Sequence, residues 1–183
     1  MAPSCGMAYY ATMRLPLGVC DVRSWRPGDA AAIVEHANNR KIWLNLRDRF
    51  PHPYTARDAR AFLKSVVGAK PETNFAIEVD GSAVGGIAFH LQTDVERIGA
   101  ELGYWLSEKY WGRGIATAAV RAVTEHALTT QGLLRVFALP FAHNRASARV
   151  LEKAGFTLEG VLRSSAIKDG QVLDQLLYAR IRA

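Results

Sequence analysis

The chain has 183 residues, of which 49% are apolar and 22% charged, so it has the composition of one globular domain and is too short for two. It contains no apolar run near the roughly 20 residues of a membrane helix. Its two cysteines, Cys5 and Cys20, are too few for a disulfide framework, which predicts a cytoplasmic protein. The net charge of +6 favours an anionic ligand, but basic and acidic residues alternate without a basic stripe or tail, so we expect neither nucleic acid nor a membrane as partner.

The first half of the chain predicts a short strand, three helices and a hairpin. Residues 1–16 carry only a weak apolar patch and are expected to form a disordered extension before a domain over residues 17–183. Thr55 and Asp58 resemble a capping box, and Asp80-Gly81 suits a hairpin turn. We therefore expect a strand over residues 19–25, helices over 30–37, 41–49 and 55–67, and hairpin strands over 75–79 and 84–91.

The second half alternates strands with amphipathic helices. We expect strands over residues 97–106, 133–139, 156–162, 165–167 and 172–181, and helices over 115–130 and 144–154. A crossover helix joins the first two of these strands, which predicts that they are parallel neighbours. The fold class is therefore α+β, a single domain with a twisted, mixed and mostly antiparallel sheet, a central parallel pair and helices on both faces.

Two glycines, Gly112 and Gly114, stand where a strand gives way to a helix. Glycines let the backbone approach a ligand closely, and the helix N-terminus behind them offers unpaired N–H groups and a positive dipole end. This arrangement suits a pyrophosphate. The simpler interpretation is a tight turn that packs the helix on the sheet. The sequence lacks GxxxxGK[ST], and no GxGxxG follows the first strand, so a P-loop or a dinucleotide fold is not expected.

The segment 109–116 resembles the acetyl-CoA pyrophosphate loop, R/Q-x-x-G-x-G/A, of the GNAT N-acetyltransferase superfamily. Segments 101–106 and 144–156 look like the RimJ/RimL-type branch, which is associated with ribosomal-protein N-terminal alanine acetylation. The resemblance extends from about Leu17 to the end of the chain, and the order of elements fits the family. Lys109 departs from the usual Arg or Gln, at a position that contributes mainly backbone.

The resemblance implies acetyl-CoA as the acyl donor. It also implies a bulge near residues 104–106 that splays this strand from residues 133–139 and admits the pantetheine arm. Arg113 either meets a phosphate or is a solvated arginine at the helix start. The implied cofactor-binding residues are Lys109, Trp111, Gly112, Arg113, Gly114, Ile115 and Ala116 at the pyrophosphate, and the main chain of Leu106 and Leu139 at the pantetheine. The histidines show no metal-ligand spacing, so no metal is expected.

Asn144 and Ser147 are three residues apart, so they share one face of a helix. On its own, Asn144 suits an N-cap and Ser147 a small helix residue. The family resemblance implies instead that Asn144 contacts the pantetheine and that Ser147 lies near the sulfur as a proton donor to the leaving thiolate. Both interpretations remain open for each residue.

Glu101 lies inside an otherwise apolar strand, where a carboxylate is costly to bury without a partner or a task. One role is an ion pair with a neighbouring strand or helix. The other is a general base, acting directly or through water, that removes a proton from the substrate ammonium. We favour Glu101 as the base.

These features predict an acetyl-CoA-dependent N-acetyltransferase in which a neutral primary amine attacks the thioester directly. No Ser-His-Asp or reactive-cysteine arrangement points to an acyl-enzyme. The alternative is a domain that binds acyl-CoA without turnover, as a sensor or interaction module. Residues 41–54 occupy the place of the acceptor wall. They do not specify the amine, which is a peptide N-terminus or a small amine, and a homodimer is expected from the family alone.

Overall fold

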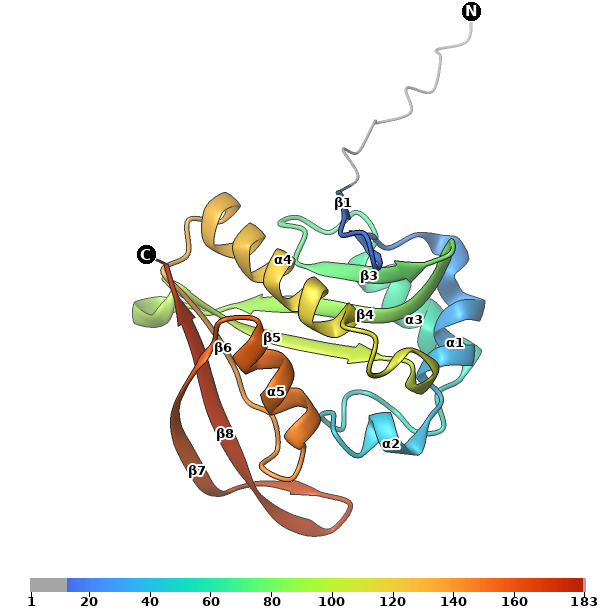
Figure 1. Cartoon of the computed structure of the whole chain (residues 1–183). Helices are drawn as coiled ribbons and strands as arrows, with labels where there is room; N and C mark the ends of the chain where they lie inside the picture. The colour runs from blue at the N-terminus through green and yellow to red at the C-terminus, as the bar shows by residue number, and fades with distance from the viewer. Residues whose placement is uncertain (1–12, 183) are drawn as a thin grey trace, which may run out of the picture.

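A mixed sheet of eight strands with helices on both faces organises residues 13–182, the part of the chain that the computed structural model describes (Figure 1). The strands are β1 (Arg14–Pro16), β2 (Asp21–Ser24), β3 (Asn74–Val79), β4 (Ser82–Leu91), β5 (Gly99–Leu106), β6 (Arg135–Ala138), β7 (Thr157–Lys168) and β8 (Gln171–Ile181). The helices are α1 (Ala30–Ala37), α2 (Arg40–Trp43), α3 (Ala56–Val66), α4 (Ile115–Thr130) and α5 (Arg145–Lys153), with short 3₁₀ turns η1 (Pro27–Asp29), η2 (Asp94–Glu96) and η3 (Glu108–Tyr110). Across the sheet the order is β1-β2-β3-β4-β5-β6-β8-β7, and the predicted α+β class is confirmed.

The N-terminal boundary differs from the prediction. Residues 1–12 of the expected extension lie outside the described residues. Arg14–Pro16 forms β1, which pairs antiparallel with β2. The Ser24 side chain accepts a hydrogen bond from the Met13 N–H at 2.8 Å. Residues 14–16 therefore belong to the domain, because β1 adds a strand to the edge of the sheet.

Several strands are shorter than predicted, such as β2 and β6, and two other elements differ more. The helix expected over residues 41–49 is only α2, and turns follow it because the side chains beyond it form ion pairs and hydrogen bonds with the sheet and the β7–β8 hairpin. The two strands expected at residues 156–162 and 165–167 are one strand, β7. A register shift accommodates Ser164, whose φ is +50°, and its N–H donates to the Asp174 carboxylate at 2.7 Å.

The parallel pair β5–β6 opens along its length, and this opening positions the site. The two strands pair only from Gly99↔Arg135 to Glu101↔Phe137. Beyond this point β5 continues to Leu106, paired with β4 but no longer with β6. The bulge predicted near residues 104–106 is not found in the register of β5 with β4, which runs without a shift from Leu106 to Ala100. The predicted splay is therefore produced by divergence of β6 from β5.

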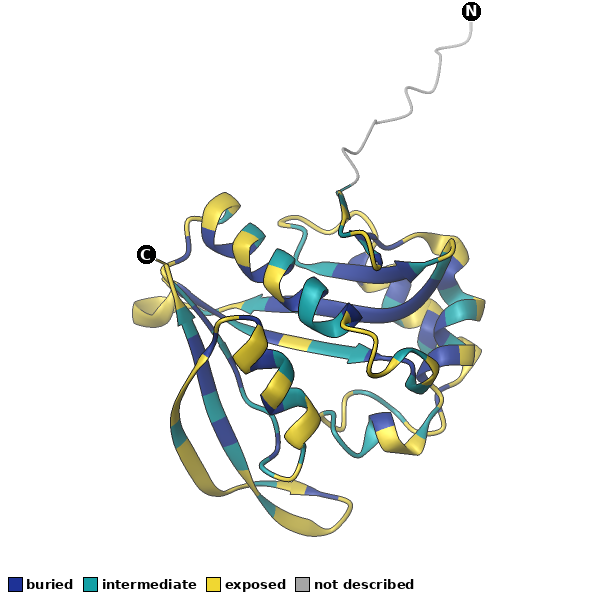
Figure 2. Ribbon diagram, in the orientation of Figure 1, coloured by how far each residue is buried: buried dark blue, intermediate teal, exposed yellow. Residues whose placement is uncertain are grey.

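Each face of the sheet carries its own apolar core. Helices α4 and α5 cover one face, where residues such as Val120, Val123 and Leu151 are fully buried against the strands. Helices α1 and α3 cover the other face (Figures 1 and 2). Ile33 and Leu63 belong to the core on this face. None of the helices in residues 13–182 is long and apolar enough to cross a membrane.

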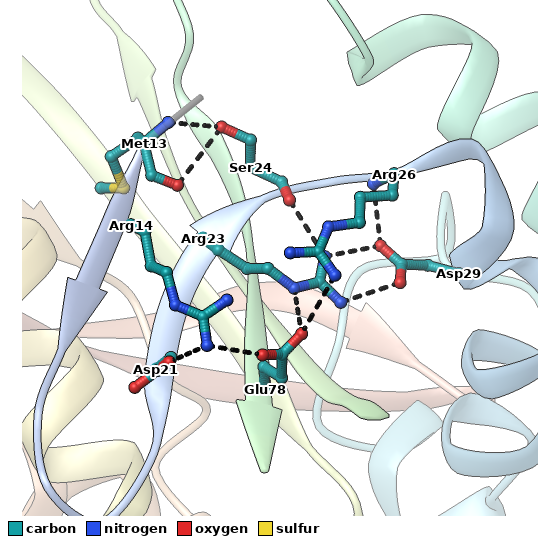
Figure 3. A network of polar contacts seen from close by, with 8 residues as sticks. All are labelled: Met13, Arg14, Asp21, Arg23, Ser24, Arg26, Asp29 and Glu78. Carbon is teal, nitrogen blue, oxygen red and sulfur yellow. Dashed lines mark hydrogen bonds and ion pairs between the residues drawn. The ribbon is translucent and has the colours of Figure 1, made fainter. Parts of the chain in front are cut away.

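A buried ion-pair network fixes the start of α1 to the sheet (Figure 3). Arg23 on β2 is only 2% exposed, and its guanidinium donates to both carboxylate oxygens of Asp29 at 2.8 Å and to Glu78 on β3. Arg14 on β1 donates to the other oxygen of Glu78 at 3.0 Å. Burial alone would raise the pKa of Glu78, but the hydrogen bond and charge of Arg23, with those of Arg14, bring this pKa below its ordinary value. The network therefore holds Glu78 as a carboxylate.

Replacing Glu78 by glutamine is expected to lower the free energy of unfolding at pH 7 by on the order of 3 kcal/mol, because buried Arg23 loses a charged partner. A carboxyl group whose folded-state pKa is depressed stabilises the fold above its unfolded pKa of about 4.3, and this contribution is lost as the pH falls through the folded-state value. Urea unfolding should therefore show a smaller difference between wild type and variant at pH 3 than at pH 7. Equal differences at the two pH values would contradict this account, and Glu96→Gln, at an exposed glutamate, is the control.

Candidate active site

A cleft of about 1390 Å³ occupies the opening between β5 and β6 and is lined from both faces of the sheet. Successive side chains of a strand point to opposite faces. Glu101, Gly103 and Trp105 therefore face the α1/α3 side, and Leu102 and Tyr104 face the α4/α5 side. The two predicted catalytic residues, Glu101 and Ser147, both line the cleft but approach it from opposite faces. The opening in the sheet connects these two halves.

The turn before α4 presents a row of open main-chain donors to the cleft. Gly112 and Gly114 have φ of +76° and +78°, the left-handed conformation that favours glycine. Within residues 13–182, the N–H groups of residues 112–117 donate no hydrogen bond, and Ala118 is the first to donate, to the Gly114 carbonyl. A Cβ atom built on either glycine meets no atom within 4 Å. The turn thus has open N–H groups and open space at a helix N-terminus, as an anion site requires.

Two cations predicted near this turn have different environments. The Lys109 side chain is absent from the cleft lining, and its Nζ pairs with Glu35 at 2.9 Å. Arg113 lines the cleft, with its guanidinium 5.1 Å from the ring centre of Tyr110. No carboxylate among the described residues pairs with Arg113, so its charge is open to a phosphate.

The main chain of β5 is unpaired where the strands diverge. Ser107 N–H donates to Val84 O on β4, so by antiparallel alternation the odd-numbered residues of β5 bond to β4. The main chain of Tyr104 and Leu106 faces the opening instead. The Leu106 carbonyl accepts from the Trp111 indole at 2.8 Å, and the Leu139 carbonyl accepts from Gln175 at 3.2 Å. The carbonyl groups of both residues whose main chain is predicted to meet the pantetheine therefore already have side-chain partners.

Asn144 is the N-cap of α5, because its side chain accepts from the Ser147 N–H at 3.1 Å. This is the N-cap role that the sequence predicts for Asn144 on its own. Its amide nitrogen donates to none of residues 13–182, and the residue lines the cleft. The N-cap therefore leaves a donor for a ligand.

Tyr104 is a candidate catalytic residue that the sequence did not predict. Its hydroxyl lies 2.7 Å from Ser147 Oγ in the cleft. Burial raises the pKa of Tyr104 to about 12, against the lowering effect of its hydrogen bond with Ser147. The only signal in the sequence is the position of Tyr104 on the strand face opposite Glu101, which says nothing about α5. This contact depends on how α5 packs on the sheet.

Glu101 forms an ion pair with Arg47, from the turns that follow α2. Its cross-strand partner on β4 is His90, and His90 Nε2 lies 2.7 Å from Arg49 Nη2. Arg47 and Arg49 both belong to the predicted acceptor wall, residues 41–54, and His90 is not among the predicted site residues. These contacts join segments more than 40 residues apart, so no local pattern reports them.

Cys20, the cysteine among the described residues, lies away from the cleft. Cys20 is buried, and burial, with the charge of Asp21, raises the pKa of its thiol to about 11, so it holds little thiolate at neutral pH. Cys5 lies outside the described residues. Among residues 13–182 no group of three or more His, Cys, Asp or Glu side chains is arranged to hold a metal ion.

The fold, the open turn before α4 and the split parallel pair agree with the sequence match: the chain belongs to the acetyltransferase (GNAT) family, whose domain matches residues 21–157. It is 34% identical over 99 residues to the Bacillus subtilis (strain 168) protein named uncharacterized N-acetyltransferase YoaA, which covers 54% of this chain and 55% of that protein. It is 28% identical over 181 residues to the Escherichia coli (strain K12) ribosomal protein uS5-alanine N-acetyltransferase, with 88% and 84% covered. The predicted family is confirmed.

A solved relative shows the same architecture. Mycobacterium smegmatis RimJ, in complex with CoA-disulfide, superposes with a TM-score of 0.76 at 27% identity, over 93% of this chain and 85% of that chain. The predicted resemblance to the RimJ/RimL branch is therefore confirmed.

Proposed function

We propose that the protein transfers the acetyl group of acetyl-CoA to a primary amine by direct attack, with a protein N-terminal α-amine as the leading acceptor. The observation that carries this proposal is the row of unpaired N–H groups at residues 112–117, at the end of a cleft that crosses the sheet. A coenzyme A complex of RimJ and the named substrate of the uS5-alanine acetyltransferase support the choice of donor and acceptor.

On the α4/α5 face, the open turn would hold the pyrophosphate and Asn144 would donate to the pantetheine. The thioester would then lie in the opening, where the main-chain N–H of Tyr104 or Leu106 is free to polarise its carbonyl. Holding amine and thioester in line would supply much of the rate enhancement. On the opposite face, Glu101 would accept a proton from the attacking amine. The incoming ammonium competes with Arg47 for this carboxylate.

The nitrogen forms a bond to the acetyl carbon, and the bond between that carbon and sulfur then breaks, releasing coenzyme A as a thiolate. Ser147 Oγ would donate a hydrogen bond to this sulfur, and the Tyr104 hydroxyl would in turn donate to Ser147. A thiol has a pKa near 8.5, well below the pKa of about 12 of Tyr104. Complete proton transfer from Tyr104 is therefore unfavourable, and the pair stabilises the thiolate by hydrogen bonding until solvent protonates it.

Replacing Ser147 by alanine is expected to lower kcat by about 10- to 100-fold, since one donor to the developing charge is lost. Tyr104→Phe should lower kcat less, because Ser147 keeps its own hydroxyl. Steady-state kinetics with one peptide acceptor measure both effects. Tyr178→Phe is the matched control, because it also removes a buried tyrosine hydroxyl that makes a hydrogen bond, here to Glu152 at 2.9 Å and outside the cleft. A loss with Tyr178→Phe equal to that with Ser147→Ala would contradict this assignment.

The proposed function is tested by calorimetric titration with acetyl-CoA, followed by incubation with peptides that begin with Ala or Ser. Binding together with an acetylated peptide N-terminus, found by mass spectrometry, is the expected result. Binding without transfer to any peptide or small amine would instead indicate a domain that binds acyl-CoA without turnover. Absence of binding would overturn the assignment of the donor.

A further inference from the structure

The segment 40–49 on the acceptor side of the cleft carries four cationic side chains, and three of them have carboxylate partners. Arg40 pairs with Asp169, Lys41 with Glu108 and Arg47 with Glu101. Arg49 has no carboxylate partner among residues 13–182. One guanidinium in this wall of the cleft is therefore not neutralised by the protein.

Arg49 is held in place by a neutral partner. Its Nη2 lies 2.7 Å from His90 Nε2, and a guanidinium can only donate, so Nε2 is the acceptor and the imidazole proton is on Nδ1. Burial, together with the nearby charge of Arg49, lowers the pKa of His90 below its ordinary value, which agrees with an uncharged ring. A guanidinium has five N–H donors, so most of those on Arg49 remain available.

His90, the partner of Arg49, is the neighbour of Glu101, the proposed base. His90 and Glu101 are direct cross-strand partners on β4 and β5, so their side chains lie side by side on one face of the sheet. Arg49 reaches this pair from the segment 40–49, and all three residues line the cleft. A molecule whose amine meets Glu101 would therefore place its neighbouring atoms beside Arg49.

No other acid of the cleft wall compensates for Arg49. Among the described residues that line the cleft, the acids are Glu101, which Arg47 already pairs, and Asp58, which caps α3 through Thr55. A planar guanidinium pairs best with a carboxylate, through two parallel hydrogen bonds. The acceptor half of the cleft thus combines one site for an ammonium with one for an anion.

We propose that Arg49 selects acceptors that carry a carboxylate close to the reacting amine. The carboxylate is either the α-carboxylate of a free amino acid or the side chain of an acidic residue at the second position of a peptide. This inference rests on the proposed acetyl transfer and names the chemical class of its acceptor.

The test compares matched acceptors and matched variants. Two acceptor pairs differ only in the carboxylate: peptides that begin Ala-Glu or Ala-Gln, and alanine or alaninamide. The enzymes are wild type, Arg49→Gln, Arg49→Lys and the control Arg163→Gln, an exposed arginine on β7 outside the cleft lining. The readout is the ratio of kcat/KM for the acidic acceptor to that for its amide. A role of Arg49 in folding alone would not change this ratio.

In the wild type, the ratio should be about 10 or more for one of the two acceptor pairs, because a hydrogen bond to a charged group contributes that much binding. The acceptor pair that shows this preference identifies the source of the carboxylate, a free amino acid or a peptide side chain. Arg49→Gln should bring the ratio close to 1, Arg49→Lys should restore part of it, and Arg163→Gln should leave it as in the wild type. Acetylation of all four acceptors without preference, or a preference that persists in Arg49→Gln, would overturn this inference and leave acetyl transfer intact. Absence of transfer to every acceptor would overturn both.

Discussion

Replacing Gly114 by alanine is expected to weaken acetyl-CoA binding on the order of 100-fold, through the loss of one to two charge-assisted hydrogen bonds. Gly114 has a φ of +78°, and the space beside it is open on the protein side. In this account that space is where the pyrophosphate approaches the N–H groups. A methyl group there holds the phosphate away from the donors, and calorimetric titration with acetyl-CoA measures the effect.

The chain offers a close control at Gly170, in the turn between β7 and β8. Gly170 has a φ of +75°, and a Cβ atom there also meets nothing within 4 Å. Gly170→Ala and Gly114→Ala should therefore lower the free energy of unfolding by similar amounts. The expected loss is about 1–2 kcal/mol, the cost of placing an L-amino acid with a side chain in the left-handed conformation. Only Gly114→Ala should weaken acetyl-CoA binding. Equal affinities in the two variants would contradict the assignment of the turn as the pyrophosphate site.

The second large effect is expected at Glu101. Glu101→Gln should lower kcat/KM about 100-fold at neutral pH, where the acceptor is mostly an ammonium and must lose a proton before it attacks. The deficit should shrink at high pH, because solvent then deprotonates the amine. Acetyl-CoA affinity should stay unchanged, since the carboxylate lies on the face of the sheet opposite the open turn. A pH profile of kcat/KM for wild type and variant measures this change.

Glu159→Gln is the control for Glu101→Gln. Glu159 also forms an ion pair with an arginine, Arg135 at the start of β6, but both residues lie outside the cleft lining. This variant should keep the wild-type pH profile. If Glu101→Gln leaves the rates unchanged at both neutral and high pH, then Glu101 has only the structural role of pairing with Arg47.

Much of the fold follows from local patterns in the sequence. The Thr55–Asp58 capping box forms as predicted, Asp80-Gly81 makes the turn between β3 and β4, and α4 has its expected bounds. Each of these features depends on residues that are close to one another in the sequence. The parallel pair follows from the handedness and length of its crossover helix.

The parts that differ depend on contacts between distant segments. The turns after α2 form because Arg47, Asp48 and Arg49 bond to other elements, although the local sequence favours a helix. Tyr104 meets Ser147 only because α5 packs beside β5. The anion site at Gly112 and Gly114 and the base role of Glu101 are argued from the residues themselves, whereas the coenzyme A ligand and the role of Ser147 come from family resemblance. All of these roles stay predictions about chemistry.

The most direct test follows the release of coenzyme A thiol from acetyl-CoA as an Ala-initiated peptide is added, with mass spectrometry of the peptide. Direct attack predicts that thiol release depends on the acceptor, with one acetylated N-terminus for each thiol and intersecting double-reciprocal plots when both substrates are varied. Thiol release that does not depend on any amine acceptor, or parallel plots with an acetylated protein, would contradict direct transfer within the cleft.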